Sequence, residues 1–212
     1  MKNKLTTLLA SAALFLTAAC RCEAATTLTL NYNTVTEVGV ASPVGVAPWL
    51  TATFTSVDSN TVTLKIDAKL SGSEFISKIG FNTVSGVSFS NLSFTATTSG
   101  GSFTTPSVIS DFNGGQGTNF TFGLNFTQGP PSARFNGNDS ITYTIDYSGP
   151  GTFNPEIFNV LDEKRGLVSI AHVQSIGTQS SSAWISPGAV IPEPSAALLG
   201  AVGFIALLRR RR

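Results

Sequence analysis

The stretch T-V-T-L-K-I-D-A-K-L, residues 61–70, decides the fold class of this chain. Every second residue is apolar, and threonine, lysine or aspartate stands between the apolar residues. Successive side chains of a β-strand point to opposite faces of a sheet, so this alternation buries one face and leaves the other in water. The same pattern recurs in further runs at residues 27–32, 49–57, 87–94, 119–126, 140–147 and 167–176.

Turn-forming residues separate these runs. Asparagine, aspartate, serine, glycine and proline gather at residues 58–60, 99–101, 114–117, 129–131, 136–139 and 148–151. Short alternating runs at this spacing predict an all-β fold, an antiparallel β-sandwich or jelly-roll-like domain. We expect no helix in this region beyond about one turn within residues 155–164.

The first 25 residues have the features of a secretory signal peptide. Lys2 and Lys4 make a positive start, and residues 5–19 form an apolar run of small and aliphatic side chains. A small-residue stretch ending at Ala25 then offers cleavage positions. We therefore exclude residues 1–25 from the fold and expect residues 26–189 to form one exported domain.

Both cysteines of the chain lie at this junction. Cleavage after Ala24 removes Cys20 and Cys22 and leaves a mature domain without cysteine. The alternative is lipid attachment at Cys20, because Thr17-Ala18-Ala19-Cys20 resembles a lipobox. A large aliphatic residue is usual where Thr17 stands, so we favour ordinary cleavage.

Residues 190–212 have three parts in a fixed order. Pro192, Glu193 and Pro194 keep the chain extended, because proline disfavours a helix before itself. An apolar run over residues 195–208 follows, and as a helix it would span about 21 Å, short of the ~30 Å hydrocarbon core. Bilayer thinning and arginine side chains reaching to the interface would cover the difference. The positive charges that orient this predicted short transmembrane helix are Arg209, Arg210, Arg211 and Arg212.

This arrangement resembles the PEP-CTERM sorting signal of Gram-negative bacteria. The resemblance implies recognition of Pro192, Glu193 and Pro194 by a membrane-embedded exosortase, which would remove the tail. It also implies an intermediate anchored in the inner membrane, followed by delivery to the cell surface or the extracellular exopolysaccharide matrix. The run A-H-V-Q with the following W-I, within residues 171–185, is similar to the end of the extracellular domain in such proteins. The alternative is a plain C-terminal membrane anchor.

The charge of the exported domain differs from that of the whole chain. Seven of the 13 basic residues and two of the 12 acidic residues lie in the terminal segments, so residues 26–189 carry 6 basic and 10 acidic side chains, a net charge of −4. A domain without a basic run is a poor partner for nucleic acid, and we expect none. Serine, threonine and asparagine replace the missing charges, as is typical of secreted β proteins.

Few residues indicate catalysis or metal binding. His172 is the only histidine, and we expect its ring to be hydrogen bonded to the backbone or to a cross-strand hydroxyl. The alternative is a base for a serine nucleophile with Asp146 or Asp162 behind it, but no serine lies in a G-x-S-x-G turn. Oxygen ligands for calcium occur in 111–113 and 136–139 without the regular calcium-loop spacing. We expect no catalytic residues, no metal and no cofactor.

Two tryptophans could contact a sugar. Trp49 follows a proline, and Trp184 ends a serine-rich run. Both are candidates for stacking on a sugar ring, although tryptophan in a sandwich more often packs in the core. The sequence therefore predicts a non-enzymatic, structural or adhesive protein of the cell surface or exopolysaccharide matrix. The alternative is a carbohydrate-binding module of the envelope or biofilm matrix.

Overall fold

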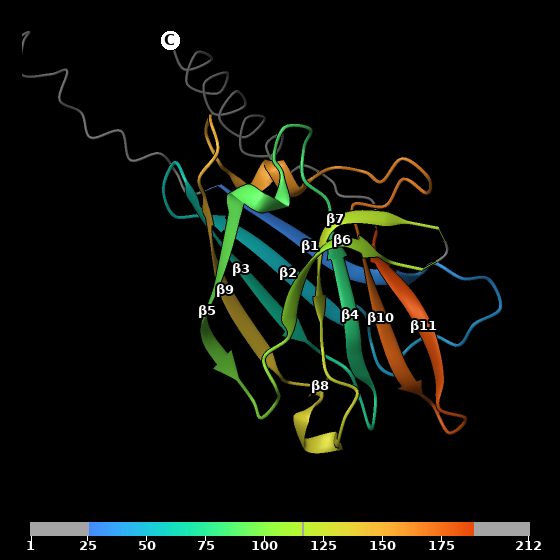
Figure 1. Cartoon of the computed structure of the whole chain (residues 1–212). Coiled ribbons are helices and arrows are strands. Elements are labelled where there is room, and N and C mark those ends of the chain that lie inside the picture. Colours follow the sequence, from blue (N-terminus) through green and yellow to red (C-terminus); the bar gives the residue numbers. More distant parts are fainter. Residues whose placement is uncertain (1–25, 116, 189–212) are drawn as a thin grey trace, which may run out of the picture.

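The computed structural model of the chain describes residues 26–115 and 117–188 and is all-β (Figure 1). The predicted signal peptide and the predicted sorting segment at residues 190–212 lie outside these residues. Among the residues described, no helix is both long enough and apolar enough to cross a membrane.

Within the described residues, eleven strands form one antiparallel sheet. In spatial order ten of them run β5-β9-β3-β2-β1-β11-β10-β4-β7-β6, and β8 pairs with β4 off this path. Their bounds are β1 (Thr27–Val35), β2 (Leu50–Ser56), β3 (Thr61–Ala68), β4 (Phe75–Phe81), β5 (Leu92–Gly100), β6 (Ser107–Asn113), β7 (Asn119–Asn125), β8 (Phe135–Asn136), β9 (Ser140–Tyr147), β10 (Ser169–Ile176) and β11 (Ser181–Pro187). Three 3₁₀ turns complete the described elements: η1 (Phe89–Asn91), η2 (Pro131–Ala133) and η3 (Pro155–Phe158).

The sheet curls round so that its two halves face each other across the main core (Figure 1). Phe54 on β2 meets Phe81 on β4 edge to face, with ring centroids 5.4 Å apart. Phe94 on the edge strand β5 lies 5.1 Å from Phe122 on β7. Aromatic rings from strands far apart in the sheet order therefore meet, and they hold the curled sheet closed.

Several predicted strands agree with the structure, and β3, β2 and β9 show the expected alternation of buried and less buried residues. The predicted strand at residues 87–94 is wrong in its bounds. Ser88 caps the 3₁₀ turn η1, and β5 begins only at Leu92. The predicted turn at residues 99–101 is also displaced, because Gly100 still pairs with Ser140 on β9. The expected single turn within residues 155–164 is η3, capped by the Asn154 side chain.

A second, smaller core lies on the outer side of β4, β7 and β10. It consists of Phe112, Phe120 and Ile170. Gly80 and Gly123 are directly paired on β4 and β7, and a Cβ atom at either position would overlap the Phe112 ring. Two glycines thus leave the space that Phe112 fills. The β6–β7 hairpin continues the sheet beyond β4, and its turn end folds over the outer face of β10 and β11, where Gly114 lies beside Ile170 and Gly115 beside Trp184 (Figure 1).

Candidate functional site

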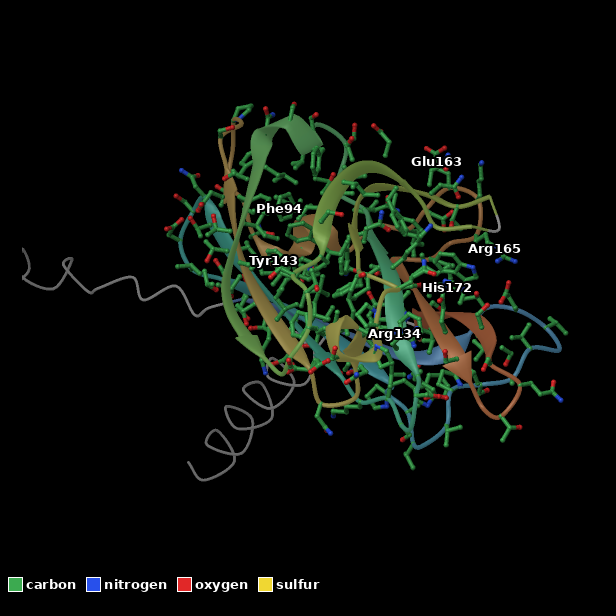
Figure 2. The ribbon with its side chains drawn as sticks, turned by 60° about the horizontal axis from the view of Figure 1, so that its bottom comes forward. Phe94, Arg134, Tyr143, Glu163, Arg165 and His172 are labelled. Atoms are coloured by element: carbon green, nitrogen blue, oxygen red, sulfur yellow. The ribbon has the colours of Figure 1, made fainter. Side chains whose placement is uncertain are left out.

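His172 and Trp184 form a stacked pair on the outer side of the sheet. They are direct cross-strand partners on β10 and β11. Their ring centroids are 4.4 Å apart, with 26° between the ring planes. Figure 2 shows His172 on the β10 side of the molecule, away from Tyr143 on β9. One face of the Trp184 indole is therefore occupied by the imidazole.

The imidazole is held by a buried hydroxyl on the neighbouring strand. The Oγ of Ser77 lies 2.9 Å from Nδ1 of His172 and 3.2 Å from the backbone oxygen of the same residue. Burial lowers the pKa of His172, and the nearby Lys78 lowers it further, while Glu37 acts in the opposite direction. The environment therefore favours the neutral ring, held by a cross-strand hydroxyl of the kind that the sequence predicts.

The carboxylates considered for a catalytic triad are engaged elsewhere. Asp146 on β9 accepts a hydrogen bond from Thr61, and β3, β2, β1 and β11 lie between β9 and β10 in the sheet. The Asp162 carboxylate accepts hydrogen bonds from three backbone N–H groups of its own loop, at residues 164, 165 and 167. Ser77 has no exposed surface. The Ser77–His172 contact therefore lacks both of the predicted acids and an accessible nucleophile.

The two tryptophans lie in different surroundings. Trp49 is 7 % exposed and belongs to the main core, where its indole nitrogen donates to the Gly45 carbonyl oxygen at 3.4 Å. It therefore offers no face to a sugar. Trp184 is half-buried, stacked on His172 and lies beside Gly115 of the β6–β7 turn. The remaining named site residues (Cys20, Pro192, Glu193, Pro194, Arg209, Arg210, Arg211 and Arg212) lie outside the described residues.

In each of the two segments considered for calcium, a side chain holds the backbone. Asp139 Oδ2 accepts from the Asn136 N–H at 2.8 Å, and Asn113 Oδ1 accepts from the Gly115 N–H at 2.9 Å. Within residues 26–115 and 117–188, no three histidine, cysteine, aspartate or glutamate side chains gather as a metal site would require. Residues 136–139 therefore form a turn stabilised by an Asx side chain, whereas residues 111–113, expected in a turn, are the end of β6.

A polar cleft of about 630 Å³ opens where β4 ends and β7 begins. We call it the β4–β7 cleft. A loop at residues 160–164 closes its other side, and Asp111 of β6 lies on its wall. Its lining residues are Asn82, Thr83, Ser85, Asp111, Asn119, Phe120, Thr121, Val160, Leu161, Asp162, Glu163 and Lys164.

Hydrogen bonds make the floor of this cleft rigid. The Thr121 N–H donates to Asn82 Oδ1 at 3.3 Å, and the Thr83 N–H donates to Thr121 Oγ1 at 3.2 Å. The Thr83 hydroxyl donates to the Val87 carbonyl oxygen at 2.8 Å. On the opposite side, the Asp162 carboxylate fixes the loop at residues 160–164 through its three backbone donors. The cleft is therefore preformed by both walls.

The exposed lining of the cleft includes charged side chains of both signs. Asp111 and Glu163 are exposed, and Lys164 is the one basic residue among the described residues that line the cleft. Asp111 has a left-handed backbone, with φ of 48°, between two residues of β6 that pair with β7. Figure 2 shows where Glu163 lies in the loop near the β6–β7 hairpin. Two exposed carboxylates facing a hydroxyl- and amide-lined floor can accept hydrogen bonds from a ligand.

The sequence did not predict this cleft. Its residues come from four separate segments of the chain, and none carries a local motif. The buried hydroxyl of Ser77 was missed as well, because F-I-S-K-I-G-F at Phe75–Phe81 does not alternate. No family model, no curated protein and no solved structure matches this chain.

Proposed function

We propose that this chain is an exported protein of the cell surface or exopolysaccharide matrix, sorted through residues 190–212. The observation that carries the proposal is the succession of Pro192-Glu193-Pro194, the apolar run at residues 195–208 and the arginines of 209–212. An extended, proline-flanked acid before a short apolar helix is accessible to a membrane protease. The arginines hold the helix in one orientation.

In this proposal residues 1–25 are a cleaved signal peptide and residues 26–189 are the delivered domain. The two facing halves of the curled sheet act as the layers of a sandwich, and they remain joined through the β1–β11 pair. Residues 190–212 form the sorting signal and a short transmembrane helix. The partners are the secretion machinery, an exosortase and, transiently, the inner membrane.

The proposed role is structural or adhesive and not enzymatic. Support comes from Ser77, which has no exposed surface and lies against the backbone of the histidine that would have to activate it. A glycan-binding role through the tryptophans has less support. Trp49 is buried, and His172 covers one face of Trp184.

The test is the fate of the tail in a Glu193→Ala variant. We expect this variant to fold normally and to keep residues 190–212, while the unaltered chain loses everything beyond the Pro-Glu-Pro region. The measurement is the intact mass of the protein recovered from the cell surface, in host strains with and without an exosortase.

Glu156→Ala is the matched control, because Glu156 is an exposed acid of the folded domain. It should be processed like the unaltered chain. Normal removal of the tail from Glu193→Ala, or an uncut tail in both strains, would contradict sorting. A lipid mass on Cys20 would show that the front end is a lipoprotein signal.

A further inference from the structure

We propose that the β4–β7 cleft is a binding site for a neutral sugar residue of a glycan. The cleft lies on the outside of the sheet, away from the main core, and its volume of about 630 Å³ is within the usual ~300–1,000 Å³ of ligand sites. The proposal deepens the proposed function, because a glycan site would retain a matrix protein in its layer. The binding itself does not depend on how the protein is sorted.

A buried side-chain amide faces the cleft. Asn82 is 8 % exposed and lines the cleft. Its Oδ1 accepts from the Thr121 N–H, which leaves the amide nitrogen as the free end of the side chain. Among the hydrogen bonds between described residues, none uses this Nδ2 group. A buried donor without a partner is costly, so a ligand oxygen at this position would be favourable.

The charged residues of the cleft limit which ligands it can bind. Ionised Asp111 and Glu163 can only accept hydrogen bonds, and sugar hydroxyls are donors that match them. The carboxylate of Asp162 is already occupied by its own loop. Among the described lining residues, Lys164 is the one cation and three are carboxylates, so a phosphate or a uronic acid would be repelled. The combination of amide donor and carboxylate acceptors suits an uncharged, polyhydroxylated ligand.

Part of the cleft lining is apolar. Leu161 is 59 % exposed at the cleft although it is a large aliphatic residue. The C–H face of a sugar is apolar, and Leu161 offers it a contact beside the polar groups. Phe120 lies beneath, 2 % exposed, and fixes the β7 wall as part of the second core. A pocket with an apolar side and a few placed polar groups is typical of small-ligand sites.

The experiment uses the full chain purified in a detergent without a sugar headgroup. The probes are the methyl glycosides of glucose, galactose, mannose and N-acetylglucosamine, with methyl glucuronide as the charged comparison. Binding is followed by backbone amide shifts in NMR. We expect at least one neutral glycoside to bind and to shift the amides of Thr83 and Thr121, and methyl glucuronide to bind at least tenfold more weakly.

Substitutions of cleft residues test whether the glycoside binds in the cleft or elsewhere on the surface. Asn82→Asp keeps the acceptor for the Thr121 N–H but loses the free amide donor, and Asp111→Asn loses a charged acceptor on an exposed side chain. Each should weaken binding about tenfold or more, the usual effect of losing a hydrogen bond to a charged or buried group. Glu163→Gln should weaken it less, because its side chain lies in the exposed loop.

Asp58→Asn and Glu156→Gln are the controls, since both acids are exposed and lie outside the cleft. They should change the affinity by less than twofold. The proposal is overturned if no neutral glycoside binds up to its solubility limit, or if Trp184→Ala abolishes binding while Asp111→Asn leaves it unchanged. Loss of binding in EDTA would also overturn it, because the acids would then hold a divalent cation. Processing of Glu193→Ala is measured independently, so failure of this site and failure of the sorting proposal are distinguishable.

Discussion

The two halves of the curled sheet use their outer faces differently. In β9, β3 and β2, buried residues alternate with partly exposed threonines, so one face packs on the core and the other meets water. In β4 and β10, six of seven and five of eight residues are buried. The difference arises because the β6–β7 hairpin covers the second half, and among the described residues no comparable cluster covers the first. The stacked histidine, the buried serine and the β4–β7 cleft all lie in the covered half.

Covering a sheet on both faces creates places where polar groups meet in a defined geometry. Ser77 and Asn82 are buried in or just after β4, where an alternating strand would have placed such residues in water. The threonines of the other half are partly exposed, so water can satisfy the hydrogen-bonding capacity that protein partners leave free. A candidate site is therefore expected in the covered half.

The largest effect that tests this comparison is expected for Phe112→Ala. Phe112 is 1 % exposed although it lies outside the main core. Its removal should lower the free energy of unfolding by about 3–5 kcal/mol, as for a core phenylalanine. Thr63→Ala, on the outer face of β3, should cost less than about 0.5 kcal/mol. Denaturant unfolding of both variants is the measurement, and similar small losses would contradict the existence of a second core.

A second variant sharpens this result. Gly123→Ala should cost about 1–3 kcal/mol by forcing a methyl group into the Phe112 ring. In the Phe112→Ala background the same change should cost less, because the ring is gone, while the Ile79 carbonyl oxygen, 2.8 Å from the added Cβ, keeps part of the cost. A double-mutant cycle measures this coupling. Additive losses would mean that Gly123 and Phe112 do not share the space.

A smaller effect concerns pH and the covered half. The folded pKa of His172 lies below its ordinary value of 6.5, so the unfolded chain takes up the proton first as the pH falls. The corresponding stability is present above pH 6.5 and declines as the pH falls through the folded pKa. We expect unfolding curves between pH 7 and pH 5 to show a loss that His172→Gln removes, well below the effect of Phe112→Ala. Equal pH profiles for both proteins would show that the imidazole has no such role.

The smallest effect is expected on the solvent-facing side of β3. Lys65 Nζ and Asp67 Oδ1 are 2.8 Å apart, with side-chain exposures of 55 % and 31 %. Asp67→Asn should cost less than about 1 kcal/mol, and added salt should reduce the difference further. Thermal unfolding at low and high salt tests this. A large, salt-independent loss would mean that this face is less solvated than the comparison requires.

Whether a strand could be predicted from the sequence depends on whether one of its faces is exposed to water. Residues 61–70 predicted β3 because one face is in water and the alternation survives. Neither β4 nor β6 was predicted, since F-I-S-K-I-G-F is buried on both faces and β6 is interrupted by the left-handed Asp111. A strand that is buried on both faces shows no alternation of apolar and polar residues in its sequence. The error in the predicted bounds of β5 has another cause. Residues 88–91 alternate in sequence as a strand would, but they form the 3₁₀ turn η1 and its cap.

For the candidate site the limits are similar. The sequence drew attention to His172 and predicted a hydrogen bond from its ring to the backbone or to a cross-strand hydroxyl. That the partner is the Ser77 hydroxyl depends on the pairing of β10 with β4. Both Trp49 and Trp184 were candidates for sugar stacking on the sequence alone. Trp49 lies in the core, and Trp184 is stacked on the imidazole of His172. The sorting segment remains a prediction from residues 190–212 alone.

The sequence by itself determined the all-β class and the faces of the alternating strands, because both depend on neighbours two residues apart. It also carries the whole case for sorting, since proline stiffness, an apolar run and clustered arginines are local properties. Only the tertiary structure decided that the β6–β7 hairpin covers one half of the sheet and that Asn82, Asp111 and Glu163 line one cleft. These residues are brought together by strand pairing over long separations, and no local pattern records which strands will meet.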